Sequence, residues 1–417
     1  MIPAVRGTHD ILPGETERWQ RLESVVRDTC ARYGYREIRT PVIERQELFE
    51  KGTGETTDIV QKEMYSFEDK GGERVTLRPE ATPSMVRAFV EHALEQEFPV
   101  TKLFSFGPMF RYERPQKGRY RQFHQLDVEV FGVAHASLDA EVIEMAVSMV
   151  QALGIDDATL VINSVGCREC RPGFSRALTD ALADRRGALC GDCQRRAETN
   201  PLRIFDCKVE KCQANIDTLP HTIDNLCDGC CAHFEQVTEL LTALGLDFTV
   251  SHRLVRGLDY YMRTTFEVVG GSLGAQNALL GGGRYDGLVA QLGGPDRPGI
   301  GFAAGLERLL LAMPAGTGPR RPDAFVVAAG DSAREPAHLL ARELRQAGLV
   351  ALVDYEPRSL KAQMKRANRT GARRALILGE DELARGEVTV REMETSEQTT
   401  VPRDEIVRRF VAERKQA

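Results

Sequence analysis

Short stretches of strand-like hydrophobic pattern recur through the first 270 residues, and turn-rich segments separate them. Pro41 interrupts the first stretch. Because proline cannot donate to a strand ladder, it suits a bent edge strand or an interface. No regular crossover helices lie between the stretches, so the pattern favours an α+β domain with a mixed, mainly antiparallel sheet. The predicted strands are residues 36–43, 73–78, 101–106, 122–131 and 263–269.

Helical spacing of hydrophobic positions predicts long helices in the same region. The first covers residues 15–34, with Trp19 and Leu22 on its apolar face. The other two cover residues 139–153 and 231–245, and strand-like sequence resumes at residue 248.

A linker rich in proline and glycine at residues 314–322 precedes a different alternation. The spacing there is βαβαβ, which predicts a small, mostly parallel α/β domain. Its predicted elements are strand 323–329, helix 333–347, strand 349–354, helix 359–370 and strand 374–379. We therefore expect three parts, which are residues 1–165 with 245–320, an insertion at 166–244, and a C-terminal part at 321–417.

Length and charge narrow the class of protein. The 417 residues are too many for one ordinary core, and 42% hydrophobic with 28% charged residues is a usual globular mix. A net charge of -6 argues against indiscriminate coating of nucleic acid, although a local basic patch stays possible. No apolar run approaches the roughly 20 residues needed to cross a bilayer, and no apolar signal segment opens the chain. We expect a cytoplasmic protein with no membrane contact.

A basic loop between two predicted strands is the most informative segment. Residues 111–121 contain five basic residues and are centred on Pro115 and Gly118. Guanidinium groups bind phosphate oxygens bidentately, so such a loop suits a polyphosphate. On charge alone, a solvated charged loop explains it equally well.

Three further segments have the composition of a ligand pocket. Residues 254–264 place Tyr260 and Tyr261 beside arginine and aspartate, although a structural turn would look similar. Residues 281–287 contain a glycine run, which lets a backbone approach a ligand closely. Residues 299–310 read as a glycine-rich strand that turns into a helix carrying Arg308.

Together these segments resemble the histidyl-tRNA synthetases, a family of class II aminoacyl-tRNA synthetases. Residues 110–132 are similar to motif 2 of that class and residues 299–311 to motif 3. Residues 254–261 and 281–288 resemble the two signature peptides of the family, and residues 6–13 and 77–82 also fit. The resemblance covers essentially the whole chain. It implies a class II catalytic domain (1–165 and 245–320), an inserted cysteine-rich helical domain (166–244) and an α/β anticodon-binding domain (321–417).

The implied activity is ligation of histidine to its tRNA through a histidyl-adenylate. A histidine carboxylate must then attack the α-phosphate of ATP, so two anions meet and positive charge must neutralise them. The resemblance places Arg111 on the α-phosphate and the carboxylate, Arg256 on the other side of the α-phosphate, and Arg308 at the γ-phosphate. These three arginines are the predicted catalytic residues.

The resemblance also distributes ATP and histidine over the pocket. Glu113 would hold the adenine end, with Arg119 and Arg121 at the triphosphate or the arriving tRNA end, and Mg²⁺ would accompany ATP. Glu129 and Tyr261 would read the imidazole ring, since a carboxylate and a hydroxyl match its donor and acceptor nitrogens. The other residues implied for histidine are Glu80, Thr82, Arg111, Gln125, Arg256, Tyr260 and Tyr285.

Nine of the ten cysteines lie between Cys167 and Cys231. The pairs Cys167–Cys170 and Cys190–Cys193 are 19 residues apart, which is the spacing of a four-cysteine zinc ribbon. These four are the predicted ligands of a structural Zn²⁺, and the later pairs could form a second site. Reduced, partly buried thiols are the alternative.

Basic residues without acidic neighbours fill residues 358–374 of the C-terminal part. Lys361, Lys365 and Arg369 are spaced four residues apart and share one helix face, whereas Leu360, Met364 and Ala367 line another face. The resemblance makes the basic face a tRNA contact and the protein a homodimer with the stretch around Pro41 at its interface. The alternatives are a catalytically inactive paralogue that senses histidine or regulates another enzyme, and a non-enzymatic tRNA-binding protein.

Overall fold

The chain divides into two compact units, Met1–Gly316 and Thr317–Ala417. The structure, a computed structural model, describes residues 1–55, 57–116, 118–199, 201–255, 257–271, 277–315 and 321–416. Among these residues, no helix is both long enough and apolar enough to cross a membrane.

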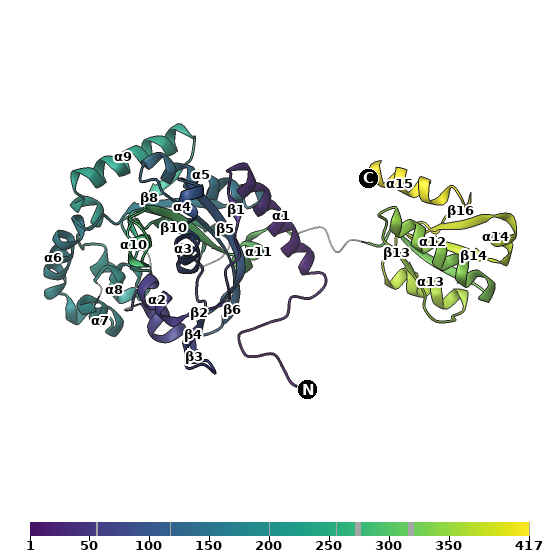
Figure 1. The fold of residues 1–417 in the computed structure, drawn as a ribbon, viewed down its shortest axis with the longest axis horizontal. Coiled ribbons are helices and arrows are strands. Elements are labelled where there is room, and N and C mark those ends of the chain that lie inside the picture. The colour runs from purple at the N-terminus through teal and green to yellow at the C-terminus, as the bar shows by residue number, and fades with distance from the viewer. Residues whose placement is uncertain are drawn as a thin grey trace. The chain divides into compact units, whose positions relative to one another are not determined.

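An eight-stranded sheet forms the centre of the first unit (Figure 1). Only the β1–β5 and β7–β8 pairs are parallel, so the predicted mixed, mainly antiparallel sheet is confirmed. The strand order is β1 (Arg36–Glu37), β5 (Thr101–Phe110), β6 (Gln122–Phe131), β11 (Gly299–Gly305), β10 (Ala278–Arg284), β9 (Met262–Gly270), β7 (Ala158–Ser164) and β8 (Phe248–Val250).

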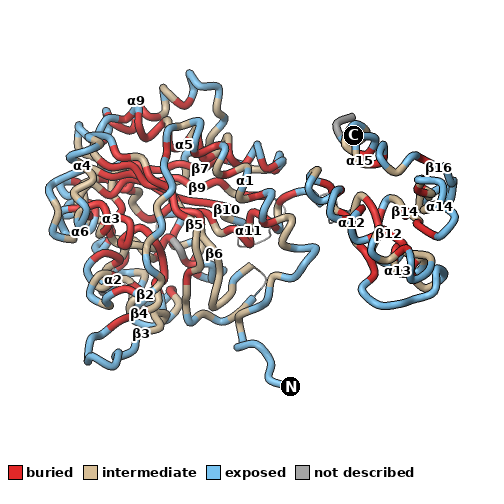
Figure 2. Tube along the Cα trace, turned by 45° about the vertical axis from the view of Figure 1, so that its right-hand side comes forward, coloured by how far each residue is buried: buried red, intermediate tan, exposed pale blue. Residues whose placement is uncertain are grey.

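One face of this sheet is covered by helices that build the largest core, and Figure 2 shows the buried strands beneath them. Leu126, Val128 and Val130 of β6 point to this face and pack with residues such as Leu22 and Val142. Alternate residues of a strand point to opposite faces, so the residues between them reach the other side. The covering helices are α1 (Thr16–Arg32), α5 (Ala136–Ala152), α9 (Asp228–Ala243) and α11 (Leu306–Ala312).

The other face carries a smaller core and leaves room for a cavity. Here Phe89 of α3 stacks on Phe131, with ring centroids 4.6 Å apart. A separate three-stranded sheet, in the order β2 (Ile43–Arg45), β4 (Arg74–Leu77) and β3 (Tyr65–Glu68), lies in the same part of the chain. The helices there are α2 (Gln46–Thr53), the π-helix η1 (Ile59–Glu63), α3 (Thr82–Glu91), α4 (Leu94–Glu97) and α10 (Leu288–Gln291).

The strand-like run at residues 36–43, which Pro41 was expected to interrupt, forms two short strands, and each lies at the edge of its own sheet. The chain leaves the large sheet after β1 and enters the small sheet at β2. The buried Arg78 holds the bend between them, because its Nη1 donates to the carbonyl oxygen of Thr40 at 3.0 Å. Pro41 cannot continue a ladder, which is consistent with a break at this point.

The segment between β7 and β8 is helical and leads into α9. It has a small core that includes Phe174, Leu178, Phe205 and three cysteine side chains. Its elements are α6 (Cys170–Ala183), η2 (Arg186–Ala188), α7 (Gly191–Thr199), η3 (Pro201–Asp206), α8 (Glu210–Ile216) and η4 (Thr222–Asn225).

The second unit contains a five-stranded sheet in the order β13 (Ala351–Val353), β12 (Ala324–Ala329), β14 (Arg374–Gly379), β15 (Glu387–Glu392) and β16 (Gln398–Pro402). The first three strands are parallel, as predicted, whereas β15 and β16 extend the sheet in antiparallel fashion. Two cores flank the sheet, one under α12 and α15 and the other under α13. The helices are η6 (Asp331–Ala333), α12 (Arg334–Gln346), α13 (Leu360–Arg369), α14 (Glu380–Arg385) and α15 (Ile406–Gln416).

Candidate active site

A cavity of about 510 Å³ opens on the second face of the large sheet. Its floor comes from β6, β10 and β11, and its walls come from the loop between β5 and β6 and from the residues before β9. Nine residues predicted for the site line it, namely Glu80, Thr82, Arg111, Glu113, Arg119, Gln125, Tyr260, Tyr261 and Arg308. Segments up to 250 residues apart in the sequence therefore meet around one space.

The alternation of β6 sends three polar residues toward this face of the sheet. Gln125 and Asp127 line the cavity, whereas Glu129 is 1% exposed and lies beyond the lining. Gly301 on the neighbouring strand makes room for Glu129, because a Cβ there would lie 1.8 Å from its Oε2. The predicted residue Glu129 is thus placed behind the surface of the cavity.

Asp127 is the residue of this floor that the motifs did not single out. Both of its carboxylate oxygens are buried and have no hydrogen-bond partner among the described residues, and the same holds for Oε1 of Gln125. Burial raises the pKa of Asp127 to about 8, and the attraction of Arg78 only partly offsets this. Its position two residues after Gln125 on a strand is the signal that could have found it.

Two further buried carboxylates at this end of the cavity do have hydroxyl donors. Glu80 accepts hydrogen bonds from Thr53 Oγ1 at 2.5 Å and from the Tyr260 hydroxyl at 3.0 Å. Glu129 accepts from Thr82 Oγ1 at 2.6 Å and from the Tyr285 hydroxyl. Burial raises the pKa of Glu80, and it raises the pKa of Glu129 to about 8. Tyr285 itself is buried and does not line the cavity.

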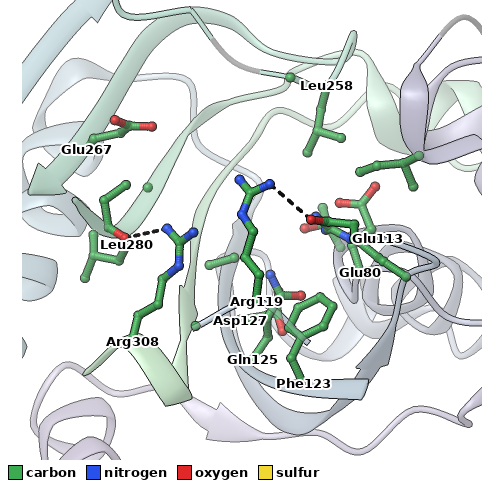
Figure 3. A pocket seen from close by; sticks show the side chains of 18 of the residues that line it. Glu80, Glu113, Arg119, Phe123, Gln125, Asp127, Leu258, Glu267, Leu280 and Arg308 are labelled. Carbon is green, nitrogen blue, oxygen red and sulfur yellow. Dashed lines mark hydrogen bonds and ion pairs between the residues drawn. The ribbon is translucent and has the colours of Figure 1, made fainter. Parts of the chain in front are cut away.

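Arginines line the opposite part of the cavity. Figure 3 shows Arg119 and Arg308 extending into it, with Arg119 paired to Glu113 at 3.0 Å. Nη1 of Arg308 donates to the carbonyl oxygen of Ala278 at 2.9 Å. Burial lowers the pKa of Arg308, and the charge of Arg119 lowers it further. Cations held close enough to repel each other favour a polyanionic ligand between them.

Arg111 lies between the two ends. Its Nε donates to the carbonyl oxygen of Pro79 at 2.8 Å, and its guanidinium lies 5.3 Å from the centre of the Phe123 ring. Arg121 does not line the cavity, because its guanidinium stacks 4.0 Å from the centre of the Tyr112 ring. Arg256 lies outside the described residues.

Two arginines of the helical insertion contact the loop of Tyr260 and Tyr261, and the sequence patterns did not reveal them. Arg203 lines the cavity, and its Nη1 donates to the carbonyl oxygen of Gly257 at 2.7 Å. Arg171 donates to the carbonyl oxygens of Asp259 and Tyr261. Because these contacts join residues more than 50 positions apart, no local pattern predicts them.

A second cluster of buried charge lies near the end of β10, and its groups are paired. Nε of Arg284 donates to Asp139 Oδ1 at 3.1 Å, while Nη1 donates to Asp286 at 2.9 Å and to the carbonyl oxygen of Val133 at 3.0 Å. His233 Nε2 lies 2.9 Å from Asp139 Oδ2. Arg284 and Asp139 are both fully buried, so this cluster belongs to the core.

The cysteines group differently from the predicted ribbon. One group contains Cys167, Cys170, Cys227 and Cys230, and the other contains Cys190, Cys193, Cys207 and Cys212. The expectation that Cys167, Cys170, Cys190 and Cys193 share one site is therefore wrong. The 19-residue spacing misled because α6 lies between the two pairs and carries them apart, while the start of α9 returns Cys227 and Cys230 to Cys167.

Helix α13 of the second unit presents the predicted basic face. Lys361, Lys365 and Arg369 are exposed on it. Ala367 is buried, but Leu360 is 44% exposed, so its predicted place in the core is wrong. Gln363 is buried instead and donates to the carbonyl oxygen of Ala328 at 2.7 Å.

Comparisons with known proteins agree with this architecture. Residues 7–309 match the family model for histidyl-tRNA synthetase, and residues 323–413 match the anticodon binding domain. The histidine–tRNA ligase of Geobacter sulfurreducens is 50% identical over 402 residues, covering 96% of this chain and 97% of that protein. That of Solibacter usitatus is 50% identical over 414 residues, 99% of each chain.

A solved structure is similar over the same extent. The apo histidyl-tRNA synthetase of S. aureus has a TM-score of 0.83 and 38% identity, and the match covers 99% of this chain and 100% of that one. The resemblance inferred from the motifs is thereby confirmed, and with it the class II fold and the anticodon-binding domain. The chain belongs to the histidyl-tRNA synthetase family.

Proposed function

We propose that the chain is a histidine–tRNA ligase. A carboxylate oxygen of histidine attacks the α-phosphorus of ATP, the bond to the bridging oxygen breaks, and pyrophosphate leaves with that electron pair. A terminal ribose hydroxyl of the tRNA then attacks the histidyl carbonyl, loses its proton and displaces AMP. The observation that carries the proposal is a single cavity with buried carboxylates at one end and arginines at the other.

The arginines hold the reacting anions in this scheme. Arg111 lines the cavity, its charge acts on both Glu80 and Arg308, and it is assigned to the α-phosphate and the histidine carboxylate. Arg119 and Arg308 are assigned to the β- and γ-phosphates, which would relieve their mutual repulsion. Arg256 is assigned to the α-phosphate from the family resemblance. Neutralising charge that grows in the transition state commonly contributes about 3 kcal/mol per donor.

The carboxylate end is assigned to the amino acid. The α-ammonium group of histidine would donate to the carboxylate of Asp127, which has no hydrogen-bond partner among the described residues, and to Glu80 and Gln125. Glu129 and Tyr261 are assigned to the imidazole ring, with Thr82 and Tyr285 holding the Glu129 carboxylate in place. A pocket of buried polar groups discriminates well, because a wrong ligand leaves those groups unpaired.

Further parts of the proposal concern the surroundings of the reaction. Mg²⁺ would enter with ATP, and the Glu267 carboxylate, which lines the cavity near Arg308, is the kind of hard oxygen ligand that Mg²⁺ takes. Glu113 is assigned to the adenine end, and Arg121, which does not line the cavity, is assigned to the arriving tRNA end. We also propose a cytoplasmic homodimer with its insertion at residues 166–244 and its anticodon-binding domain at 321–417.

Histidine-dependent exchange of pyrophosphate into ATP tests the first step directly. Wild type should exchange label only when histidine is present, and Arg111→Ala and Arg256→Ala should each lower the rate by roughly 100-fold or more. Arg408→Ala, which changes an arginine whose side chain is 79% exposed and lies outside the cavity, is the control and should exchange normally. Absence of exchange in the wild type would favour the inactive, regulatory paralogue.

The tRNA contact needs a separate test. Replacing Lys361, Lys365 and Arg369 by glutamine should weaken tRNA binding and flatten its dependence on salt, because fewer counterions are released on binding. Pyrophosphate exchange, which needs no tRNA, should be unchanged. The matched control replaces Arg342, Arg385 and Arg408, which are exposed in the same unit but lie outside α13. Equal losses in both triple variants would move the contact away from α13.

A further inference from the structure

The helical insertion carries two separate groups of four cysteines. The neck group, which is Cys167, Cys170, Cys227 and Cys230, joins the point where the chain enters the insertion to the first turn of α9. The inner group, which is Cys190, Cys193, Cys207 and Cys212, lies within the insertion around η3. In each group the four sulfur atoms all lie within 4.8 Å of one another.

The sulfur separations match a single tetrahedral ion. Four sulfurs at about 2.3 Å from a central Zn²⁺ lie about 3.8 Å apart along the edges of the tetrahedron. In the neck group, Cys167 Sγ is 3.7 Å from Cys170 Sγ and 3.8 Å from Cys227 Sγ. In the inner group, Cys190 Sγ is 3.9 Å from Cys207 Sγ. A disulfide would require about 2.05 Å, and the structure contains all ten cysteines as free thiols.

Backbone amides donate to sulfur atoms in both groups. In the neck group, the amides of Glu169 and Cys227 donate to Cys167 and Cys170 at 3.4 and 3.1 Å. In the inner group, Cys212 accepts from the amide of Cys190 at 3.2 Å. Cys190 and Cys207 also accept from amides, each at 3.4 Å. Such donors orient metal-bound thiolates and stabilise their negative charge.

The backbone at the neck is shaped for this arrangement. Gly166 has φ +67°, and a Cβ there would lie 2.7 Å from Cys170 Cβ. A larger residue would therefore displace the turn that carries Cys167. The carbonyl oxygen of Gly166 accepts from the amide of Arg263, which ties this turn to the edge of β9.

The small hydrophobic core of the insertion is a physical reason for structural metal ions. Among the described residues, its core cluster has nine buried apolar side chains besides those of Cys193, Cys207 and Cys212. A small core seldom supplies enough stability alone, and structural metals commonly make up the difference. Four buried or half-buried cysteines without a metal would contribute little more than small apolar side chains.

We propose that each group binds one structural Zn²⁺ and that the two ions fix the insertion against the histidine-binding loop. Two arginines transmit this support. Arg171 directly follows Cys170 of the neck group and donates to the carbonyl oxygens of Asp259 and Tyr261. Arg203 lies in η3, four residues before Cys207 of the inner group, and donates to the carbonyl oxygen of Gly257. Val255 packs into the core of the insertion from the same loop.

Metal content tests the two sites independently of activity. Full-length chain purified without chelators should contain two zinc ions, measured by elemental mass spectrometry against protein concentration. Cys193→Ser and Cys230→Ser should each contain one. Cys231→Ser, which removes an exposed cysteine next to the neck group but outside both groups, should retain two. A wild-type content below one ion, or iron with the absorbance of an iron–sulfur cluster, would overturn the proposal.

Thiol alkylation of the native wild type covers the case in which a cysteine variant does not fold. Cys231 should react at once, and the eight cysteines of the two groups should react only after a strong zinc chelator is added. Peptide mass mapping identifies which thiols are modified. Reaction of all eight at the rate of Cys231 without chelator would exclude bound metal.

The supporting role of Arg171 rests on the proposed function and is tested by comparing the KM for histidine with the KM for ATP. Arg171→Ala should raise the KM for histidine about tenfold in pyrophosphate exchange while the KM for ATP and the zinc content stay unchanged. Arg171→Lys should recover part of the loss, and Arg176→Ala, on the same helix, is the control. An unchanged KM for histidine would show that Arg171 does not support the histidine-binding loop. Wild type without exchange would instead refute the proposed function and leave the zinc sites standing.

Discussion

Two buried carboxylates of the first unit have opposite surroundings. Asp139 receives hydrogen bonds from Arg284 and His233, so although burial favours its neutral form, these partners lower its pKa below the ordinary value. Asp127 is equally buried but has no hydrogen-bond partner among the described residues, and burial raises its pKa to about 8.

The difference separates a structural charge from a binding charge. A buried polar group in a folded protein is normally paired, so each unpaired one calls for an explanation. The charged groups around Asp139 are hydrogen-bonded to one another. They lie in the core, and none of them lines the cavity. Asp127 lines a cavity of about 510 Å³, so its missing partner can come from a ligand. Changes to the paired Asp139 should therefore lower the stability of the fold, and changes to the unpaired Asp127 should lower activity.

The largest expected effect comes from breaking the complete cluster. Among the described residues, Asp139→Asn leaves the buried guanidinium of Arg284 with Asp286 as its one counter-ion. Removing one partner of a buried ion pair typically costs about 3–5 kcal/mol of unfolding free energy. Urea denaturation followed by circular dichroism measures this loss. Asp286→Asn, which removes the half-buried partner, should cost clearly less, and equal costs would show that Asp139 is no special anchor.

The matching change in the cavity, Asp127→Asn, should reverse the pattern. Histidine activation in pyrophosphate exchange should fall by roughly 100-fold, because the amide no longer attracts the α-ammonium group. The unfolding free energy should rise at pH 8. In the folded protein the pKa of Asp127 is about 8, whereas its ordinary pKa is 3.8. The folded state therefore loses stability relative to the unfolded state as the pH rises between these two values. Asparagine does not titrate, so it avoids that loss.

Comparing the same variant at two pH values provides the control. Near pH 4 both side chains are neutral when folded, so Asp127→Asn should then leave the unfolding free energy close to that of wild type. A variant that loses stability at pH 8 and keeps full activation would show that Asp127 is a structural residue.

Much of this comparison was readable in the sequence. The limits of β6 were predicted to the residue, and the arginine-rich motif and the tyrosine pair do line one cavity. Gln125, Asp127 and Glu129 are spaced two residues apart along that strand, so the sequence also predicts that they share one face of the sheet. Whether a buried carboxylate has a partner depends on residues far away in the sequence, and that information appears only in the fold.

Other features depended on long-range geometry in the same way. Cys167 joins Cys227 across 60 residues, so the shorter spacing to Cys190 and Cys193 suggested the wrong partners. The contacts of Arg171 and Arg203 with the tyrosine loop have no local signature. The hairpin of β15 and β16 and helix α15 follow the last strand that the βαβαβ spacing predicted, and no motif marked them.

The pH dependence of histidine binding is the next smaller effect. In the proposed function the α-ammonium group binds the ionised form of Asp127, and with a pKa of about 8 that form becomes scarce below pH 8. Histidine should therefore bind at least roughly fivefold more weakly at pH 7 than at pH 8. Isothermal titration at the two values measures this, and most of the imidazole ring of free histidine stays neutral in this range. Asp127→Asn should reduce the difference to the part that Glu129, whose pKa is also about 8, contributes, and an unchanged slope in that variant would assign the titration to Glu129 or another group.

The smallest expected effect concerns Glu129, the carboxylate that lies between the two extremes. It is as buried as Asp127, yet the hydroxyls of Thr82 and Tyr285 donate to it and lower its pKa, although burial still keeps that pKa at about 8. Tyr285→Phe removes one of these donors and should raise the pKa further. Since a single hydrogen bond contributes about 1 kcal/mol, histidine activation at pH 7 should fall only about threefold to tenfold. The pH midpoint of activation should move to a more alkaline value.

Thr82→Val removes the other donor to Glu129, at the first residue of α3, and should shift the midpoint in the same direction. Thr82→Ser keeps the hydroxyl and should leave it in place. If Tyr285→Phe lowered activation equally at every pH, the phenol would be acting by filling space in the core around Phe131. If both donor-removing variants shift the midpoint, the charge state of Glu129 is what the enzyme uses. Glu129, a carboxylate with two hydroxyl donors, would then make histidine activation depend on pH less than Asp127 does and more than Asp139 does.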